Sequence, residues 1–371
     1  MAVQELYIDH TGGTDPGPEP GSGGDGSIGN PYKTLSVAFT NIPTTSSVIR
    51  INVKNTSSSS KMTSLGSLPT GRSIATSVVI APYSSAAGDT EDLVYLDAGG
   101  SNNAFNQPND DAIAWNRCHF SNTAGGQFFD LDNNIIMFRC VFDGCNPESD
   151  NAMQAWFCEF KNAPSEVFKS GGNSGMYHCV VTGSGEATGT PITCANMVGN
   201  VIYWAGSRDH LARGNSASNL CINNSFIYDN NTHATGDGYG YRVDDQSWCA
   251  FNYFESCARG IDAESNSEVI LKSPNAFYNN TANRYTVGSN RVDMTLPIAA
   301  ADYNLSASGM PNAGSSNYTI SSELAALRTN QYSPFPGSST TYEALFGAPF
   351  QSAGGGTTGR QGLHGIETGS V

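Results

Sequence analysis

Four cysteines, each followed two positions later by a large apolar residue, recur along the middle of this chain. They stand in "RCHFSN", "RCVFDG", "FCEFKN" and "HCVVTG", at positions 118, 140, 158 and 179. Carrying the spacing forward reaches asparagines in "GNVIYW", "NNSFIY", "FNYFES" and "PNAFYN", at positions 200, 224, 252 and 275. We call these four cysteines and four asparagines the anchors. The residue two positions after each anchor is apolar: Phe120, Phe142, Phe160, Val181, Ile202, Phe226, Phe254 and Phe277. Intervals of 18 to 28 residues indicate a solenoid of short strands rather than helical repeats of fixed length.

Side chains alternate along a strand, so each anchor shares a face with the apolar residue two positions later. The intervening residues are mostly polar and are expected to face solvent: His119, Glu159, Ser225 and Tyr253. A second apolar cluster follows most anchors, near Phe129, Val167, Ile192, Leu211 and Ile261. Each turn therefore carries at least two strands, and stacked turns bury one continuous core. The pattern predicts an all-β chain folded as a parallel β-helix.

The anchors then form a ladder inside the coils, first of cysteine and then of asparagine. Packing explains the cysteines better than a metal site, because the chain has no Cys-x-x-Cys pair. Inward asparagines are expected to hydrogen-bond the backbone of the coils above and below. The chain has nine cysteines, an odd number, and its start lacks the layout of a signal peptide. We therefore expect mostly free thiols.

Composition excludes two classes of partner. Charged residues make up 14% of the chain, with 18 basic against 33 acidic side chains and a formal charge of -15. This balance provides no broad basic face for a phosphate backbone, so we expect no nucleic-acid partner. No apolar run reaches the length of a membrane span, so we expect no membrane partner.

The N-terminal segment carries a more specific pattern. A Gly/Pro-rich loop at 11–31 is followed by "YKTLSVAF", which places Leu35, Ala38 and Phe39 on one helical face. The stretch "YIDHTGGTDPGPEPGSGGDGSIGNPYKTLSVAF" resembles the entry segment of the pectate-lyase-like right-handed β-helix superfamily, with its "G-x-x-x-x-P-[YF]-K-T-[LI]" motif. The resemblance implies a right-handed helix of about nine to ten coils whose open end is capped by a short helix.

These features divide the chain into three predicted parts. Residues 1–45 hold the first strand, the loop and the capping helix, and residues 46–290 form the β-helix. Residues 291–371 are rich in Gly, Asn, Ser and Pro and are expected to form an irregular extension that packs on the coils or on a partner chain. The tail "GGGTTGRQGLHGIETGSV" belongs to this last part.

One coil is longer than its neighbours, and loops inserted on a rigid scaffold are common functional sites. Its extra segment is "NNTHATGDGYGYRVDD", and the preceding coil contributes "GSRDHLAR". Paired carboxylates suit glycoside hydrolysis and tyrosine rings stack on sugars. The candidate catalytic residues are Asp209, His210, Asp237 and Asp244. The candidate binding residues are Arg208, Tyr239, Tyr241, Arg242 and Asp245. The alternative interpretation is that all of these are solvated loop residues.

No metal site or cofactor is predicted. The segment "DLDNN", with Asp130, Asp132 and Asn134, alternates oxygen ligands as a calcium loop does, but it lacks the glycine and the distal Glu of such a loop.

Two functions of different classes remain open, because the fold itself fixes no activity. The favoured one is a bacteriophage virion surface protein, a tailspike, fibre or capsid-decorating component assembled in the host cytoplasm. Its partners would be other virion proteins, further copies of itself and a cell-surface polysaccharide; the resemblance implies a homotrimer. The alternative is an extracellular polysaccharide lyase or glycoside hydrolase, so the sequence leaves open whether the chain is an enzyme.

Overall fold

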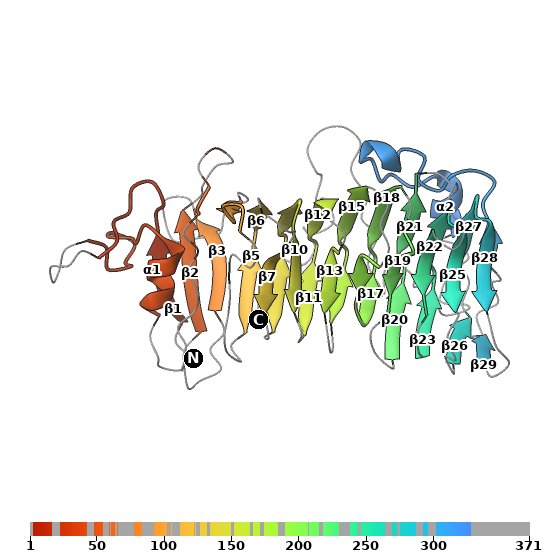
Figure 1. The fold of residues 1–371 in the computed structure, drawn as a ribbon, viewed down its shortest axis with the longest axis horizontal. Coiled ribbons are helices and arrows are strands. Elements are labelled where there is room, and N and C mark those ends of the chain that lie inside the picture. The colour runs from red at the N-terminus through yellow and green to blue at the C-terminus, as the bar shows by residue number, and fades with distance from the viewer. Residues whose placement is uncertain are drawn as a thin grey trace. The chain divides into compact units, whose positions relative to one another are not determined.

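The computed structural model divides the chain into two compact units, Met1–Ser174 (unit 1) and Gly175–Val371 (unit 2). Both units are built almost entirely from parallel strands (Figure 1). The structure describes residues 3–16, 23–42, 48–54, 59, 61–63, 65, 78–83, 93–101, 105, 112–121, 123, 127–131, 134–149, 152–163, 166–170, 174–184, 190–206, 208–214, 218–229, 238–243, 246–263, 269–272, 275–286, 292–295 and 302–327.

Unit 1 contains strands of three parallel sheets, which we number in the order in which one coil visits them. The first sheet contains β1 (Val3–Ile8), β2 (Val48–Lys54), β3 (Val78–Tyr83), β5 (Ile113–Asn116), β8 (Ile135–Phe138) and β11 (Met153–Trp156). The second contains β4 (Val94–Asp97), β6 (Cys118–Ser121), β9 (Val141–Asp143) and β12 (Glu159–Ala163). The third contains β7 (Gln127–Leu131), β10 (Asn146–Ser149) and β13 (Phe168–Ser170).

Unit 2 repeats the same order of strands. Its first sheet contains β14 (Gly175–Tyr177), β17 (Asn196–Val198), β20 (Ser218–Ile222), β23 (Gln246–Ala250), β26 (Val269–Lys272) and β29 (Val292–Thr295). Its second contains β15 (Val180–Ser184), β18 (Val201–Ala205), β21 (Ser225–Tyr228), β24 (Tyr253–Glu255), β27 (Ala276–Tyr278) and β30 (Tyr303–Asn304). Its third contains β16 (Ile192–Thr193), β19 (His210–Arg213), β22 (Tyr239–Arg242), β25 (Arg259–Ala263) and β28 (Ala282–Thr286).

The predicted all-β class is confirmed, and the three parallel sheets are consistent with a parallel β-helix. The predicted division into three parts stays a prediction.

In seven of the coils, a left-handed residue makes the corner between the first and second sheets. The residue before each of the first seven anchors has a positive φ of 53° to 71°: Arg117, Arg139, Phe157, His178, Gly199, Asn223 and Phe251. Because this conformation costs an L-residue about 1–2 kcal/mol, the surrounding coil must hold it in place. The sharp turn directs the next side chain, which is the anchor, into the interior.

The cysteine anchors bond to the carbonyl of the last residue of the preceding first-sheet strand. The Sγ atoms of Cys118, Cys158 and Cys179 donate to the carbonyl two residues earlier, at 3.4 to 3.5 Å. Cys140 Sγ also lies 3.2 Å from the Trp115 carbonyl of the preceding coil. All nine cysteines of the chain are buried and free, as predicted.

The asparagine anchors of unit 2 join each coil to the next through both ends of the amide. Asn224 Oδ1 accepts from the Asn200 backbone N–H at 3.0 Å, and Asn224 Nδ2 donates to the Met197 carbonyl at 3.0 Å. Asn252 repeats the pattern with Asn224 and Cys221, at 2.8 and 2.9 Å. The predicted hydrogen bonds from side-chain amides to backbone groups are therefore confirmed for the preceding coil, whereas the contact with the following coil joins two side-chain amides.

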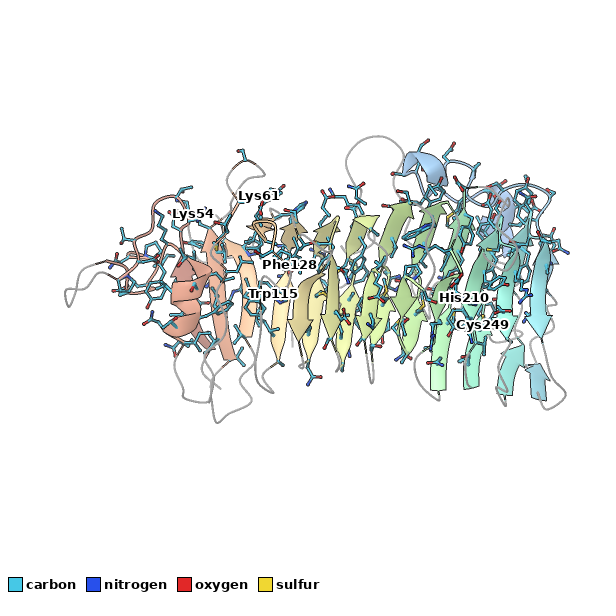
Figure 2. The ribbon with its side chains drawn as sticks, viewed as in Figure 1. Lys54, Lys61, Trp115, Phe128, His210 and Cys249 are labelled. Carbon is cyan, nitrogen blue, oxygen red and sulfur yellow. The ribbon has the colours of Figure 1, made fainter. Side chains whose placement is uncertain are left out.

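Aromatic rings stack in the interior beside the anchors. In unit 1 the Phe120, Phe142 and Phe160 rings follow one another at 4.7 and 5.0 Å between centroids. In unit 2 the Phe226, Phe254 and Phe277 rings do so at 5.0 and 5.4 Å. Trp115 and Phe128 complete the aromatic interior of unit 1 (Figure 2), each in contact with Phe120.

The residues between each anchor and the apolar residue two positions later were expected to face solvent, and this is wrong for three of the four, because His119, Ser225 and Tyr253 are buried. Ser225 and Tyr253 are fully buried, because residues 302–327 pack over the second sheet of unit 2. Leu305, Met310 and Leu324 of that segment belong to one apolar cluster with Tyr253. The segment includes a 3₁₀ turn at Ala313–Ser315 and helix α2 (Ser322–Ala326), which Ser321 caps through the Leu324 N–H.

Near the N-terminus, helix α1 spans Leu35–Thr40, with Thr34 as its cap and the predicted face of Leu35, Ala38 and Phe39 buried. The Asp15 carboxylate fastens the preceding loop by accepting from the Lys33 and Thr34 backbone N–H groups, at 2.9 and 3.2 Å. The role of a helix as the cap of the coils stays a prediction. The predicted tail at 354–371 lies outside the described residues.

Candidate functional site

The third sheet of unit 2 brings together the residues that the sequence singled out in two successive coils. Strands β19 and β22 pair in parallel, with His210 opposite Tyr239 and Arg213 opposite Arg242. The Tyr239 N–H donates to the Asp209 carbonyl at 3.0 Å, which fixes where the long coil rejoins the sheet. The predicted carboxylates Asp237, Asp244 and Asp245 lie outside the described residues.

Four side chains on β19, β22 and β25 form what we call the long-coil cluster: His210, Tyr239, Arg259 and Asp262. The His210 Nε2 atom lies 3.2 Å from Asp262 Oδ2, and Arg259 Nη1 donates to Asp262 Oδ1 at 3.0 Å. The Arg259 guanidinium lies 4.6 Å from the Tyr239 ring centroid, and the His210 ring lies 4.8 Å from the same ring. Figure 2 marks His210 on the structure.

The Asp262 carboxylate is the electrostatic centre of this cluster. It is completely buried, so its charge must be paired within the protein. Oδ2 of Asp262 faces the His210 imidazole, and Oδ1 faces the Arg259 guanidinium, so each carboxylate oxygen has a nitrogen partner. The Arg259 side chain keeps 22% of its surface exposed and is the most accessible member of the two ion pairs. A ligand arriving from solvent would meet this cation first.

The geometry orients the imidazole as a carboxylate orients a catalytic histidine. If Nε2 carries the proton toward Asp262, the Nδ1 atom of His210 presents a lone pair that can accept a proton. The cluster thus combines a proton acceptor, a cation and an aromatic ring on three neighbouring strands. These groups suit binding of an acidic sugar and abstraction of a proton from it.

Two other candidates belong to the packing of unit 2. Tyr241 is 1% exposed, and burial beside Cys221 and Cys249 raises the pKa of its hydroxyl well above the ordinary value. Arg208 is also buried, with its guanidinium 4.6 Å from the Trp204 ring centroid. Both locations count against direct contact with a ligand. Asp209 and Arg242 are half-buried.

Sequence reasoning missed Arg259 and Asp262. Both stand in "RGIDA", where only the apolar Ile261 was noted. The alignment of the third-sheet strands was not extended from β22 to β25. That pairing places Arg259 opposite Tyr239 and Asp262 opposite Arg242. Long-range pairing of this kind becomes visible only when three strands per coil are assigned.

The part of the chain that the structure describes contains no group of three or more His, Cys, Asp or Glu side chains arranged to hold a metal ion. Asp132 and the side chain of Asp130 lie outside it. Within the same residues, no helix is long and apolar enough to cross a bilayer.

Comparison of the chain with models of protein families, with curated proteins and with solved structures gives no match in any of the three.

Proposed function

We propose that this chain is a surface protein of a bacteriophage virion that recognises a polysaccharide of the host cell. Tailspikes, fibres and capsid-decorating proteins belong to this class. In this proposal the three parallel sheets form a right-handed β-helix of the pectate-lyase-like type, and the chain assembles with other copies of itself or with other virion proteins. Assembly takes place in the host cytoplasm.

The observation that carries this proposal is the state of the cysteines. All nine are buried, free thiols. Disulfides form in oxidising compartments and are rare in the cytosol. A chain with nine unpaired cysteines fits folding in the reducing cytoplasm of a host better than export as a secreted enzyme.

The long-coil cluster supports the recognition of a polysaccharide. Arg259 offers a cation beside the loop that precedes β22, and its guanidinium packs on the buried Tyr239 ring, which the parallel sheet holds in register with it. Rigid presentation lowers the entropy that a binding site loses on association.

Mass spectrometry of purified virions tests the location. The proposal expects the intact chain in the particle at a stoichiometry that matches a symmetric structural component. Absence of the chain from particles, together with its appearance in the culture medium of uninfected cells, would contradict it.

A screen of host polysaccharides tests recognition. We expect wild-type protein to bind at least one of them and Arg259→Ala to bind it less tightly. Ser36→Ala, which changes a residue of α1 in unit 1, serves as the control with unchanged binding. If no host polysaccharide binds while the chain is present in the particle, its role is architectural.

Cleavage of the bound glycan is a second candidate function, favoured by the contact of His210 with Asp262. In this scheme His210 removes the proton beside the carboxylate of an acidic sugar, a C=C bond forms as the C–O bond to the neighbouring sugar breaks, and water protonates the departing oxygen. Asp262 orients the imidazole, and Arg259 balances the charge of the carboxylate. His210→Gln should lower cleavage by about 10² to 10⁴, with smaller effects on binding. Binding without release of new sugar ends would identify an adhesin instead.

A further inference from the structure

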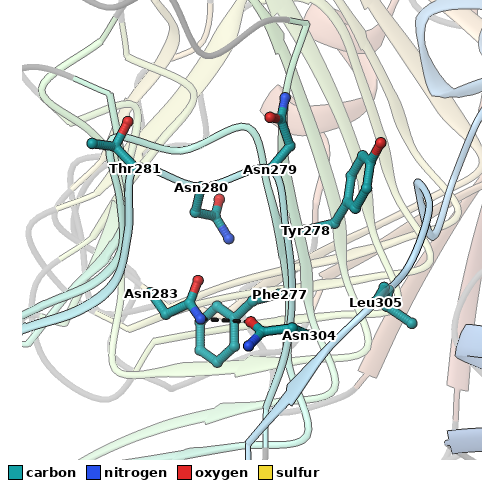
Figure 3. Close-up of a pocket in the computed structure, with 8 residues that line it drawn as sticks. All are labelled: Phe277, Tyr278, Asn279, Asn280, Thr281, Asn283, Asn304 and Leu305. Carbon is teal, nitrogen blue, oxygen red and sulfur yellow. Dashed lines mark hydrogen bonds between the residues drawn. The ribbon is translucent and has the colours of Figure 1, made fainter.

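A polar pocket lies among the last described strands of unit 2, apart from the long-coil cluster. Its volume is about 360 Å³, and Figure 3 shows the eight residues that line it. They come from β27, from the turn that follows it, from β28 and from the end of β30: Phe277, Tyr278, Asn279, Asn280, Thr281, Asn283, Asn304 and Leu305. Pockets for small ligands begin at roughly 300 Å³, so this one has room for one or two sugar rings.

The pocket lining is neutral. None of its eight residues carries a carboxylate, an ammonium or a guanidinium group. The nearby Arg284 guanidinium lies 5.9 Å from the Phe277 ring centroid, and its charge is paired, since its Nη2 donates to Asp302 Oδ1 at 2.6 Å. Four of the eight are asparagines, and an amide supplies donors and acceptors without net charge.

Two asparagines hold the wall of the pocket. Asn280 Oδ1 accepts from the Cys257 backbone N–H at 2.7 Å, and its Nδ2 donates to the Phe254 carbonyl at 3.0 Å. Asn279 has φ of 53° and donates to Ser256 Oγ at 3.2 Å. Both are tied to the preceding coil, so the wall is preformed.

The other two asparagines present hydrogen-bonding groups to the pocket. Asn283 Nδ2 donates to Asn304 Oδ1 at 2.7 Å, across the gap between β28 and β30 (Figure 3). This bond links the two amides and leaves Asn283 Oδ1 as an acceptor and Asn304 Nδ2 as a donor on opposite sides of it (Figure 3). The Thr281 and Tyr278 side chains add two hydroxyl groups to the same lining.

From this arrangement we infer that the pocket binds a neutral saccharide, with Asn283 Oδ1 and Asn304 Nδ2 engaging hydroxyl groups of the sugar. Each sugar hydroxyl can donate and accept, so a neutral acceptor and a neutral donor can both bind hydroxyl groups. The half-buried Tyr278 ring offers an apolar face to the sugar. The neutral lining separates this site from the long-coil cluster, whose cation suits an acidic sugar.

The choice of a saccharide rests on the proposed function, whereas the neutral class and the position rest on the pocket. Binding is measured by saturation-transfer NMR on the full chain. The probes are the methyl pyranosides of glucose, galactose, mannose and rhamnose, with glucuronate as the charged comparison. We expect at least one neutral glycoside to bind, and glucuronate to bind at least tenfold more weakly at this site.

The variants Asn283→Ala and Asn304→Ala should each weaken that binding at least tenfold. Asn134→Ala, at an exposed asparagine of unit 1, should leave it unchanged. Thr281→Val changes an exposed residue to one of nearly equal volume and should also weaken binding. It tests the pocket even if the two amide variants do not fold.

Three results would overturn the inference: no neutral glycoside binds, bound glycosides are unaffected by all three pocket variants, or glucuronate binds in preference at the pocket. None of these three results contradicts the proposed function, because virion location and polysaccharide binding through Arg259 are measured separately. Loss of polysaccharide binding in Arg259→Ala, with glycoside binding retained, would show that the two sites are independent.

Discussion

The hydroxyl of Tyr253 accepts a hydrogen bond from the backbone N–H of Gly309, 56 residues further along the chain, at 2.7 Å. The same hydroxyl donates to Glu255 Oε2 at 2.6 Å. Through this bond the segment 302–327 is attached to the outer face of the second sheet of unit 2. Burial beneath the segment raises the pKa of Glu255, so the hydroxyl of Tyr253 also supplies a donor to a poorly solvated carboxylate.

Tyr253→Phe should therefore loosen this segment. The change leaves the Gly309 N–H and the Glu255 carboxylate each short of a buried partner, at a cost of about 1–3 kcal/mol. Amide hydrogen exchange across residues 305–327 should accelerate by a corresponding factor. Tyr278→Phe, at a half-buried tyrosine of β27, should change exchange little. Equal exchange in both variants would show that apolar contacts alone hold the segment.

The ring stack of unit 2 gives a second prediction. Phe254 is fully buried between Phe226 and Phe277, so Phe254→Ala opens a cavity that the rigid coil cannot close. We expect a loss of about 3 to 5 kcal/mol in the free energy of unfolding by urea. Ile136→Ala, at an exposed position of β8, should cost less than 1 kcal/mol, about the range of ordinary surface changes. A small cost at Phe254 would contradict the assigned interior.

The repeat predicted the interior well because anchor and core residue recur in every coil. All eight anchors are buried, and so are all eight apolar residues that stand two positions after them. The prediction that the intervening residues face solvent failed at His119, Ser225 and Tyr253. Ser225 and Tyr253 are covered by a segment that is distant in the sequence, which no local pattern reveals. The repeat missed Asp262 because a buried carboxylate is defined by partners on other strands, which the spacing within one coil does not reveal.

The amide ladder gives a third prediction. Asn224→Ala removes the acceptor of the Asn200 N–H and the donor to the Met197 carbonyl, both in the interior. Two buried polar groups without partners should cost about 2 to 6 kcal/mol together. The urea midpoint should fall, whereas Asn134→Ala, at an exposed asparagine, should leave it within error. A neutral effect at Asn224 would mean that water replaces the amide.

The thiols should be protected from reagents in the native protein. The thiolate is the reactive form, and burial raises the pKa of Cys145 to about 12 and that of Cys194 further still. A water-soluble aromatic disulfide should titrate no thiol in buffer and all nine in denaturant. Rapid modification of the four anchors at 118, 140, 158 and 179 would contradict their inward position.

The last prediction concerns acid stability and His119 on β6. Its side chain is 11% exposed, its ring centroid lies 5.0 Å from that of Tyr95, and its Nε2 atom lies 3.8 Å from Asp143 Oδ2. Burial and the nearby Lys161 ammonium lower the pKa of His119 from 6.5 to about 4, although Asp143 opposes the shift.

The folded protein therefore leaves His119 neutral between about pH 6.5 and pH 4, while the unfolded chain takes up a proton there. Stability from this residue is complete above pH 6.5 and is lost as the pH falls to about 4. The full linkage would approach 3 kcal/mol, and solvent screening of this partly open site reduces it to about 1 to 2 kcal/mol. Glutamine cannot titrate, so the difference in unfolding free energy between wild type and His119→Gln should narrow by that amount from pH 7 to pH 4. A difference that stays constant with pH would show that His119 titrates alike in both states.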